Sequence, residues 1–571
     1  MPADFFQPDT THGRSSRAPA AGRRGMAASA HPYATLAGLD VLKDGGNAFD
    51  AAVAVASTLN VVEPYMSGVG GIGIALVYVA KENRTRVLNF SGRAGSKATP
   101  DRFTEESKTT GARSPLVPGN VAGWLEMHGK YGKLPRKRVF RDAIDYAENG
   151  APLTPFNAEM LKMNWALLTR FESTKKSFLG GARKPSPAGA LFKQRDLAAS
   201  LSAIAEGGAK EFYTGGIGNK ISRTLKEMDG VITADDLAAY KPEWQEPLTC
   251  NYRGFEVRVP PPNSSGFQIS ETLNILSGFK NLEYGTADTL HTLMEAVKLA
   301  VEDRVKYSGD PDFVDIPVKR LLSATHAESL SKKISMAKAR TQAKQRYPRE
   351  HLAAGDGTEG ERGPSSASGT AADFGPGAPG WWRDGLTTHF AVADSDGNVV
   401  TVTQTLGNGY GSGVVMADTG IFLNNMSLWF DIDAKTPSPN LVAPNKRVDF
   451  CVAPCQLFKD GEFALSIGTP GSYGILQTTL QMIHHYVDAG MNVQEAIDAP
   501  RFRLHEPGVQ NFEGRFPQEF INQLNARGHT IKRLPQDWSR AVGGAHGIQR
   551  TEHGTYLGGA DPRRDGVALG F

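Results

Sequence analysis

Cysteine is scarce in this sequence: its 571 residues include three, Cys250, Cys451 and Cys455. Three thiols cannot build a disulfide framework, and the Cys451/Cys455 pair has no second Cys or His pair at the spacing of a zinc site. We therefore expect ordinary buried thiols, no metal site and no cofactor.

Long apolar runs are missing as well. No stretch of about 18 apolar residues occurs, and the polar segment 1–24 has no apolar centre of the kind that signal peptides carry. These absences predict no membrane association and a cytoplasmic location.

The net charge is small. Lys+Arg 63 against Asp+Glu 60 leaves +3, and the basic residues are scattered along the chain. Nucleic-acid binding needs a basic patch, so we expect no nucleic-acid partner and a small-molecule one instead. What the chain does have, 40% hydrophobic residues and 63 glycines, is typical of a soluble globular enzyme.

Two helices are predicted near the N-terminus, after a disordered tail over residues 1–24. Apolar residues between 36 and 42 indicate a first helix that stops at Gly45-Gly46, since glycine is common just after a helix. Asn47 is a suitable N-cap for a second helix through the apolar run 51–59, which Pro64 ends.

A glycine-rich segment follows these helices. Gly68, Gly70 and Gly73 form a literal G-x-G-x-x-G. In dinucleotide-binding folds this pattern follows a strand and opens a helix. Here it follows a helix and precedes a strand-like run, 74–79, so we predict a tight loop with close backbone approach rather than a nucleotide site.

The rest of the chain divides at a flexible tether. From about 115 to 330 the pattern indicates helices joined by short loops, including one over 293–307. The segment from about 338 to 386 turns rich in Gly, Ser and Pro and is too long for an ordinary connection. Beyond the tether, a strand over 463–467 and a helix over 475–489 are expected.

A β-hairpin is predicted directly after the tether. Residues 387–394 and 399–405 alternate, and Ser395-Asp396-Gly397-Asn398 is a strong turn sequence. With Asp396-Gly397 as a two-residue loop, residue 388 lies opposite residue 405. We therefore expect Thr405 beside the Thr387-Thr388 step, to within one residue of register.

Thr387 is a candidate nucleophile. A threonine hydroxyl is weakly nucleophilic, and a free α-amino group on the same residue can serve as its base. Thr387 acquires such an amine only if the backbone is cleaved between Leu386 and Thr387. The alternative is that Thr387 and Thr388 are two β-branched residues that merely begin a strand.

The segment from residue 387 to residue 398 closely resembles the start of the small subunit in γ-glutamyltranspeptidases. Further blocks of the same family occur in the same order along the chain, from about residue 25 to residue 571. They are Gly45-Gly46-Asn47-Ala48, Asp50-Ala51-Ala52, Pro118-Gly119 with Gly123, Asp235-Asp236-Leu237 with Tyr240, Pro260-Pro261-Pro262-Asn263-Ser264-Ser265-Gly266, Gly309-Asp310-Pro311-Asp312-Phe313, Pro444-Asn445-Lys446-Arg447 and Asp561-Pro562-Arg563.

The resemblance implies an α+β fold of the N-terminal-nucleophile hydrolase type, an αββα sandwich of two stacked antiparallel sheets flanked by helices. It implies a precursor cut into a large subunit, 25–386 after the tail, and a small subunit, 387–571. Thr387 is then the nucleophile, and Thr405 orients it and assists self-cleavage. Gly471 and Ser472 match the family's Pro-Gly-Gly loop, whose backbone N–H groups form an oxyanion hole.

The resemblance also implies a substrate pocket, and here the chain departs from the family. The arginine that binds a glutamate α-carboxylate is replaced by Ser91, with Arg93 two residues later. The serine pair that assists it reads Phe450-Cys451. Arg93 can still clamp a carboxylate, although a surface arginine is the alternative interpretation.

The side of the pocket that holds the α-amino group departs further. After Asn424-Asn425 the chain has Met426 and Trp429 where relatives place polar residues, and an expected asparagine is displaced to Asn408. An ammonium without an acidic partner is costly to desolvate. A glutamyl α-amine is therefore expected to fit poorly beside Met426 and Trp429.

Three functions remain open at this stage. The first is a γ-glutamyl hydrolase or transferase whose acyl-enzyme is resolved by water or an amine. The second is an acylase or amidohydrolase for a carboxyacyl amide without an α-amine, of the glutaryl or oxamate type. The third, a non-enzymatic binding protein on the same fold, is disfavoured by the retained Thr387, Thr405 and Pro-Gly loop.

Overall fold

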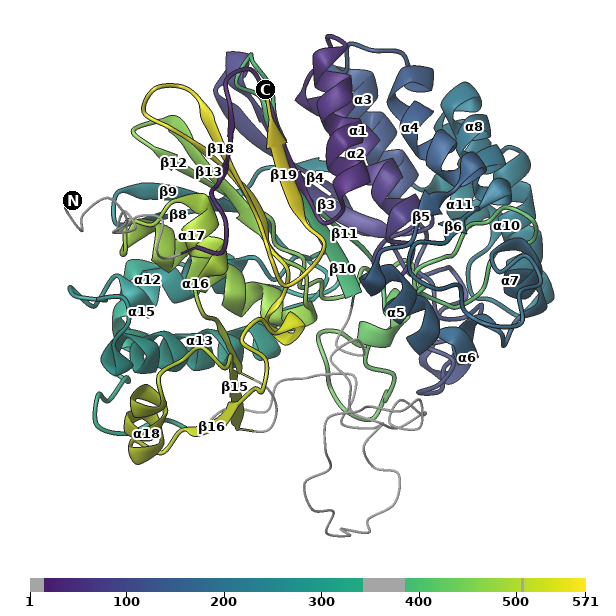
Figure 1. The fold of residues 1–571 in the computed structure, drawn as a ribbon. Coiled ribbons are helices and arrows are strands. Elements are labelled where there is room, and N and C mark those ends of the chain that lie inside the picture. The colour runs from purple at the N-terminus through teal and green to yellow at the C-terminus, as the bar shows by residue number, and fades with distance from the viewer. Residues whose placement is uncertain (1–14, 342–385, 505–507) are drawn as a thin grey trace.

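A computed structural model describes residues 15–341, 386–504 and 508–571. Its centre is a pair of stacked antiparallel sheets with helices on both outer faces (Figure 1). The expected αββα sandwich is therefore confirmed. Most of the predicted tether, 342–385, lies outside the described residues. No helix within the described ranges is long and apolar enough to cross a bilayer.

Each sheet has seven strands. The first has the order β1 (Ala20–Gly22), β18 (Tyr556–Ala560), β17 (His546–Arg550), β13 (Glu462–Gly468), β12 (Cys455–Lys459), β9 (Phe255–Val259), β8 (Leu248–Tyr252). The second has the order β19 (Val567–Gly570), β2 (Met26–Ser29), β10 (Leu386–Ala393), β11 (Val399–Gly407), β3 (Ile72–Val79), β4 (Arg84–Phe90), β7 (Glu243–Gln245). Both sheets thus combine strands from before and after the tether.

Helices cover the outer face of each sheet. Over the second sheet lie α1 (Pro32–Lys43), α2 (Ala48–Val62), α3 (Asn120–Tyr131), α4 (Arg136–Asn149) and α8 (Arg195–Gly207), followed along the chain by α9 (Ala209–Tyr213), α10 (Gly216–Glu227) and α11 (Ala234–Ala239). The helices α5 (Pro155–Met163) and α6 (Trp165–Leu168) share a hydrophobic cluster with the ends of β10 and β11, and α7 (Glu172–Ser177) follows them. On the side of the first sheet lie α12 (Phe267–Leu276), α13 (Ala287–Tyr307), α14 (Val318–Leu321), α15 (Ala324–Ser331), α16 (Ile475–Val487), α17 (Val493–Asp498) and α18 (Gln518–Ala526). Small sheets pair β5 (Ala151–Pro152) with β6 (Leu191–Phe192) and join β14 (Phe502–Leu504), β15 (Val509–Phe512) and β16 (Thr530–Arg533).

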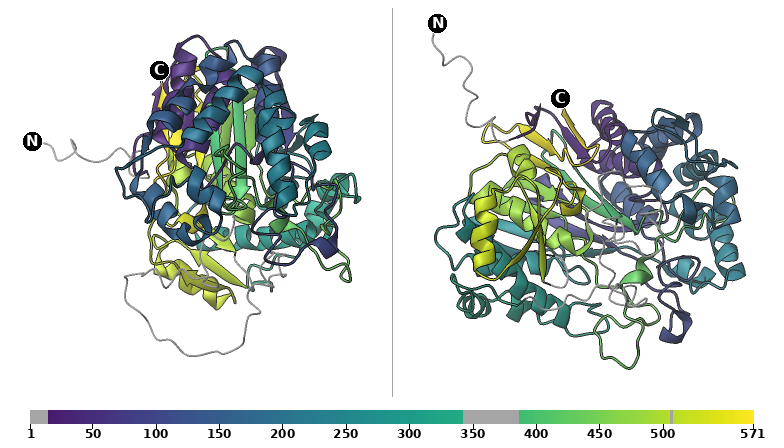
Figure 2. Two further views of the ribbon diagram at one scale, coloured as in Figure 1. Left: turned by 90° about the vertical axis from the view of Figure 1, so that its right-hand side faces the viewer. Right: turned by 60° about the horizontal axis from the view of Figure 1, so that its bottom comes forward.

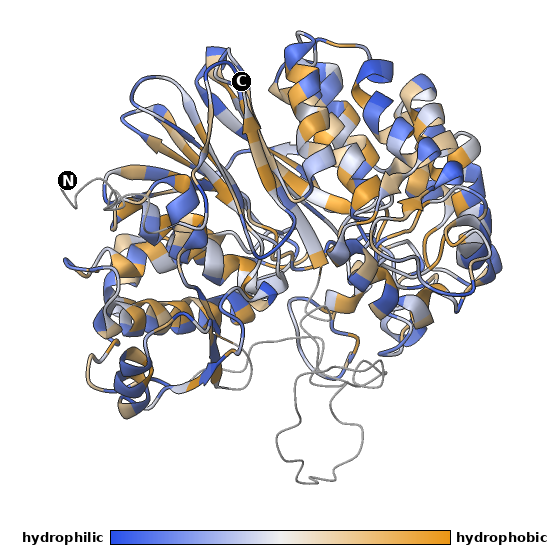
Figure 3. Ribbon diagram, in the orientation of Figure 1, coloured by the Kyte–Doolittle hydropathy of each residue, from blue (hydrophilic) through white to orange (hydrophobic). Residues whose placement is uncertain are grey.

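The central strands are buried on both faces. Every residue of β3, β10 and β11 is buried, and in the left view of Figure 2 the green strands run through the middle of the molecule, flanked by helices. The helices alternate hydrophobic and hydrophilic segments along their length (Figure 3). Polar side chains on β10 and β11 therefore lie in an environment with little water.

Several local predictions are confirmed. Asn47 caps α2 through a capping box with Asp50, and α1 ends before Gly45, whose φ is 89°. Gly70 forms a bridge with Leu423, and a β-carbon at Gly71 would lie 2.6 Å from the carbonyl oxygen of Thr405. The glycine segment is therefore a tight loop packed on the end of β11.

Two element predictions are wrong. The tail is not disordered throughout, because β1 pairs with β18 and Ser16 donates two hydrogen bonds to the Asp498 carboxylate. The region predicted as helical contains β7, β8 and β9. The β8–β9 hairpin turns at Arg253-Gly254, both with positive φ, and in its strands buried residues alternate with more exposed ones.

The β10–β11 hairpin has the predicted neighbours but a wider turn. Thr387 pairs with Thr405, one residue from the predicted register. The loop runs from Asp394 to Asn398, because the Asp394 carboxylate accepts the backbone N–H groups of Asp396 and Asn398 and closes a five-residue turn. The two-residue loop is therefore wrong, and the pairing of the threonines is confirmed.

Candidate active site

Thr387 and Thr405 share a hydrogen bond at the start of the hairpin. Thr387 Oγ1 donates to Thr405 Oγ1 over 3.3 Å, and both residues are almost fully buried. Thr405 Oγ1 in turn accepts the backbone N–H of Gly407 at 2.8 Å. The Thr405 hydroxyl is thus held in one position by the strand that carries it.

The Thr405 hydroxyl also contacts the peptide bond expected to break. Its Oγ1 donates to the carbonyl oxygen of Leu386 at 2.5 Å. The strand pairing is irregular between Leu386 and Thr387, and such irregularities re-aim groups at functional sites. The two hydroxyls and the Leu386 carbonyl therefore form one continuous chain of hydrogen bonds.

Two charged side chains that the sequence did not reveal hold the residues after the cleavage point. Glu63, at the C-terminal end of α2, accepts a hydrogen bond from Thr388 Oγ1 at 3.1 Å. Arg564 donates from Nη1 to the carbonyl oxygen of Thr387 at 3.3 Å. Burial raises the pKa of Glu63 to about 7, although Arg564 acts in the opposite direction.

The predicted oxyanion loop opens a helix. Gly471 precedes a 3₁₀ turn, Ser472–Gly474, that continues directly into α16. The first N–H groups of a helix have no acceptor within it and lie at the positive end of its dipole. Gly471 has φ 130° and Ser472 φ 58°, and their role as oxyanion donors stays a prediction.

A short series of contacts links this loop to Thr387. Thr469 Oγ1 accepts the backbone N–H of Gly544 at 3.0 Å. A β-carbon on Gly544 would clash with the Arg564 side chain, which itself bonds the Thr387 carbonyl. Gly544 and Arg564 therefore connect Thr469, which precedes the loop, to the candidate nucleophile.

Asn425, Asn408 and Met426 line the end of β11. Asn425 Oδ1 accepts the backbone N–H of Asn408 at 2.9 Å, and its Nδ2 donates to Thr109 at 2.7 Å, so it braces the loop. Asn408 Oδ1 is buried with no hydrogen-bond partner in the described part of the chain. Met426 is buried, and a β-carbon on Gly407 would lie 3.2 Å from its sulfur.

Phe450, Cys451 and Trp429 are also buried. Phe450 exchanges backbone hydrogen bonds with the segment 263–265. Burial raises the pKa of Cys451 to about 12, so it is a neutral thiol. The ring of Trp429 meets Tyr473 edge to face at 5.0 Å, which places it beside the predicted oxyanion loop.

Arg93 is already paired. Its guanidinium bonds the carboxylates of Asp312 at 2.7 Å and Glu243 at 3.1 Å and the carbonyl of Asn445 at 3.0 Å. A substrate carboxylate at this position would have to replace one of these acids. The role of Arg93 in substrate binding stays a prediction.

Residues that could ligate a metal ion lie apart from the two threonine strands. The structure assembles His291, Glu295 and His529 in one group, and Glu271, Asp303 and His326 in another. Sequence spacing could not reveal either group, because each joins residues from separate elements.

Replacing Thr405 by alanine is expected to slow cleavage before Thr387 by on the order of 10²–10³-fold, as removal of one donor to a developing oxyanion does. The appearance of two fragments from freshly purified precursor, followed on denaturing gels, measures the rate. Thr405→Ser keeps the hydroxyl and should process nearly normally. Equal rates for Thr405→Ala and wild type would remove Thr405 from the reaction.

The chain is similar to known proteins over nearly its whole length. The gamma-glutamyltranspeptidase family model matches residues 34–571. The chain is 34% identical to the glutathione hydrolase proenzyme of Escherichia coli (strain K12), over 97% of this chain and 93% of the relative. It is 35% identical to the acylase ACY 1 proenzyme of Pseudomonas sp. (strain SE83), over 96% of this chain and 94% of the relative.

A solved structure is similar over the full length. The cephalosporin acylase from Bacillus halodurans has a TM-score of 0.85 at 31% identity, covering 100% of this chain and 99% of that one. These relatives are enzymes, two of them named as proenzymes, so this chain is an amidohydrolase or acyltransferase made as a precursor. Because the match extends over nearly the whole sequence, the chain belongs to the γ-glutamyltranspeptidase family.

Proposed function

We propose that Thr387 cleaves its own chain and then hydrolyses amides of acyl groups that end in a carboxylate. In the precursor, Thr387 Oγ attacks the Leu386 carbonyl carbon. Its proton passes to Thr405 Oγ, which gives its own proton to the Leu386 oxygen along the observed hydrogen bonds. When this intermediate collapses, the bond from the Leu386 carbon to the Thr387 nitrogen breaks, and the proton on the Leu386 oxygen passes to that nitrogen. This frees the α-amine of Thr387 and leaves an ester on its Oγ. Water then hydrolyses the ester, which releases the Thr387 hydroxyl and a carboxylate on Leu386.

The same groups support the second reaction. The freed α-amine of Thr387 takes the hydroxyl proton while the oxygen attacks the substrate amide, and it returns a proton to the leaving amine. The N–H groups of Gly471 and Ser472 receive the negative oxygen of the intermediate. Water, or an amine in a transfer reaction, then resolves the acyl-enzyme.

The proposal that the substrate carries a carboxylate rests on Arg304. This arginine of α13 is 1% exposed and lines a cavity with Trp429, Tyr473 and Asp449. Its guanidinium carbon lies 3.8 Å from the centre of the Tyr473 ring. Within the described residues, Nε and Nη2 have no hydrogen-bond partner. A buried guanidinium with two unused donors suits a carboxylate ligand.

Two residues that line the cavity, Tyr473 and Trp429, belong to segments that also carry candidate site residues. Tyr473 directly follows Ser472 of the predicted oxyanion loop. Trp429 ends the 3₁₀ turn Met426–Trp429, whose first residue packs beside Gly407.

The cavity has more capacity for a carboxylate than for an ammonium. Asp449 already accepts hydrogen bonds from Ser265, Ser308 and Tyr473, and it lies 3.6 Å from Arg304 Nη1. Asp431, which also lines the cavity, accepts one from Ser438. The unused groups are the donors of Arg304, which favours a glutaryl-type acyl group over a γ-glutamyl group.

The two donor types can be compared directly. We expect kcat/KM for a glutaryl anilide to equal or exceed that for the matching γ-glutamyl anilide, because two donors of Arg304 remain for a carboxylate while both acids that line the cavity already accept hydrogen bonds. The rate of aniline release from the mature enzyme measures both. A preference of about tenfold or more for the γ-glutamyl compound, or roughly 1.4 kcal/mol, would instead support a γ-glutamyl hydrolase or transferase.

A further inference from the structure

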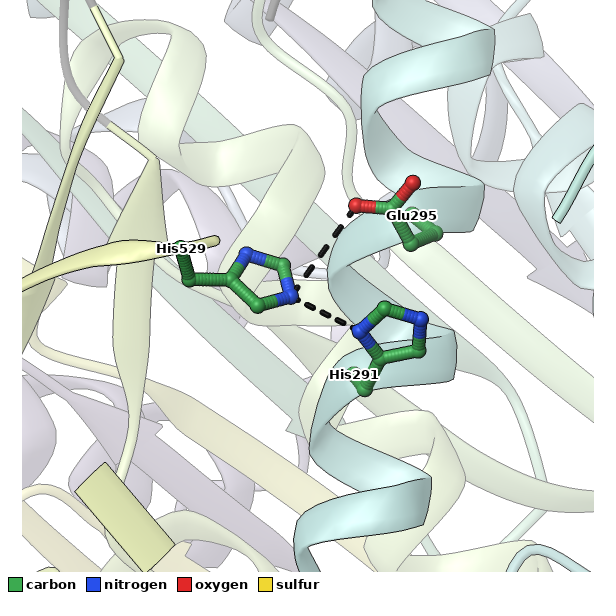
Figure 4. A group of neighbouring side chains, drawn as sticks. All are labelled: His291, Glu295 and His529. Carbon is green, nitrogen blue, oxygen red and sulfur yellow. Dashed lines mark hydrogen bonds and ion pairs between the residues drawn. The ribbon is translucent and has the colours of Figure 1, made fainter. Parts of the chain in front are cut away.

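Two clusters of potential metal ligands lie on the helices that cover the first sheet. One joins His291 and Glu295 of α13 to His529, which follows α18 (Figure 4). His291 Nδ1 and His529 Nε2 lie 2.8 Å apart, and His529 Nε2 lies 4.0 Å from a Glu295 oxygen. All three residues are buried.

A lysine already supplies the cation in this first cluster. Lys298 Nζ lies 2.7 Å from Glu295 Oε1 and 3.3 Å from His529 Nδ1, and it donates to the carbonyl of Arg340. The Glu295 charge is therefore neutralised from within the chain. Bound metal would place a second positive charge beside the ammonium, which Coulomb repulsion disfavours.

The second cluster contains no lysine. It joins Glu271 of α12, Asp303 of α13 and His326 of α15. His326 Nε2 lies 2.7 Å from Asp303 Oδ2 and 3.3 Å from Glu271 Oε1. Glu271 is 0% exposed, and neither of its oxygens has a hydrogen-bond partner among the described residues.

The charges in this cluster do not balance as they do in the first. Glu271 and Asp303 bring two carboxylates to one imidazole, and no ammonium belongs to this group. Buried carboxylates are normally paired or bound to metal. The His326 ring nitrogen points at both acids, in the place where a cation would be shared.

We propose that Glu271, Asp303 and His326 bind a divalent cation of the zinc class, which ties α12, α13 and α15 together. Two carboxylates and an imidazole form a donor set that suits such ions. Ligand atoms of a tetrahedral zinc ion lie roughly 3.3 Å apart, from bond lengths of about 2.0–2.1 Å. The Glu271 to His326 separation already matches, and Asp303, which is partly exposed, must move outward by about 0.6 Å.

Zinc uptake by the untagged, chelator-treated protein tests the site. We expect one Zn²⁺ per chain by calorimetry and metal analysis near neutral pH, with a rise of several degrees in melting temperature, since a ligand that binds only the folded state stabilises it. Glu271→Gln keeps the shape of the side chain and removes the charge. It should lower zinc affinity by at least about tenfold and abolish the melting-temperature rise.

The lysine-containing cluster provides the matched control. His529→Gln should leave zinc stoichiometry and the zinc-induced shift unchanged. Without metal, Glu271→Gln should melt at or above the wild-type temperature, because it removes an unsatisfied buried acid. No stoichiometric zinc uptake by the wild type, or uptake that Glu271→Gln retains in full, would overturn the proposal and leave a shared proton as the neutralising charge.

Discussion

Replacing Thr387 by alanine is expected to leave a single band near 61.4 kDa on a denaturing gel and to lower amide hydrolysis by at least about 10⁴-fold. The variant keeps the tether and the Thr405 bond to the Leu386 carbonyl, but it has no oxygen to attack that carbonyl. Without the attack, no ester forms, and no α-amine is released to serve as a base. Intact mass spectrometry after prolonged incubation measures the processing.

Thr387→Ser is the matched control, because it keeps both the hydroxyl and the backbone nitrogen. It should still be cut before residue 387 and should retain measurable activity. Cleavage at this position in Thr387→Ala would exclude Thr387 as the agent of processing. If neither Thr387→Ser nor the wild type were cleaved, self-processing itself would be contradicted.

Replacing Arg304 by methionine is expected to lower kcat/KM for a glutaryl anilide by roughly 100-fold. Two charge-assisted hydrogen bonds, worth about 1.5–3 kcal/mol each before desolvation is subtracted, leave a net loss of about 3 kcal/mol. The methionine side chain fills much of the same space, and the change removes the unused donors at Nε and Nη2. Initial rates over a range of substrate concentrations give kcat and KM separately.

Two controls distinguish a loss of carboxylate binding from a general loss of folded structure: a neutral substrate and a variant at a second arginine. The valeryl anilide has no carboxylate, so Arg304→Met should change its kcat/KM by no more than about threefold. Arg93→Met should have little effect on the ratio of kcat/KM for the glutaryl anilide to kcat/KM for the valeryl anilide, because Arg93 is already paired with Asp312 and Glu243. A carboxylate-specific loss in Arg93→Met, with none in Arg304→Met, would reverse the assignment of the anchor.

Local structure could be predicted from the sequence where it depends only on residues close together in the chain. Asn47 and Asp50 cap α2 because their side chains reach the first N–H groups of that helix. The pairing of Thr387 with Thr405 could be predicted because the turn fixes the register. The width of that turn could not, since it depends on the Asp394 carboxylate folding back on two amides.

Elements that depend on distant partners were harder to predict. The strand β1 exists because it adds to the edge of β18, more than 500 residues later in the chain. The strands β8 and β9 are short and separated by helices from the sheet they join. Strand formation of this kind depends on pairing and burial more than on intrinsic preference.

The sequence by itself determined the family, the sandwich fold, the candidate cleavage point and the two threonines, because motifs and hairpin register are local and ordered along the chain. Only the tertiary structure decided which charged groups surround them. Glu63 and Arg564 bond to Thr388 and Thr387, Arg304 lies over Tyr473, and all three charged residues are buried although they are far apart in the sequence. Their roles depend on which hydrogen-bonding groups remain unpaired after folding, a property that no spacing of residues encodes.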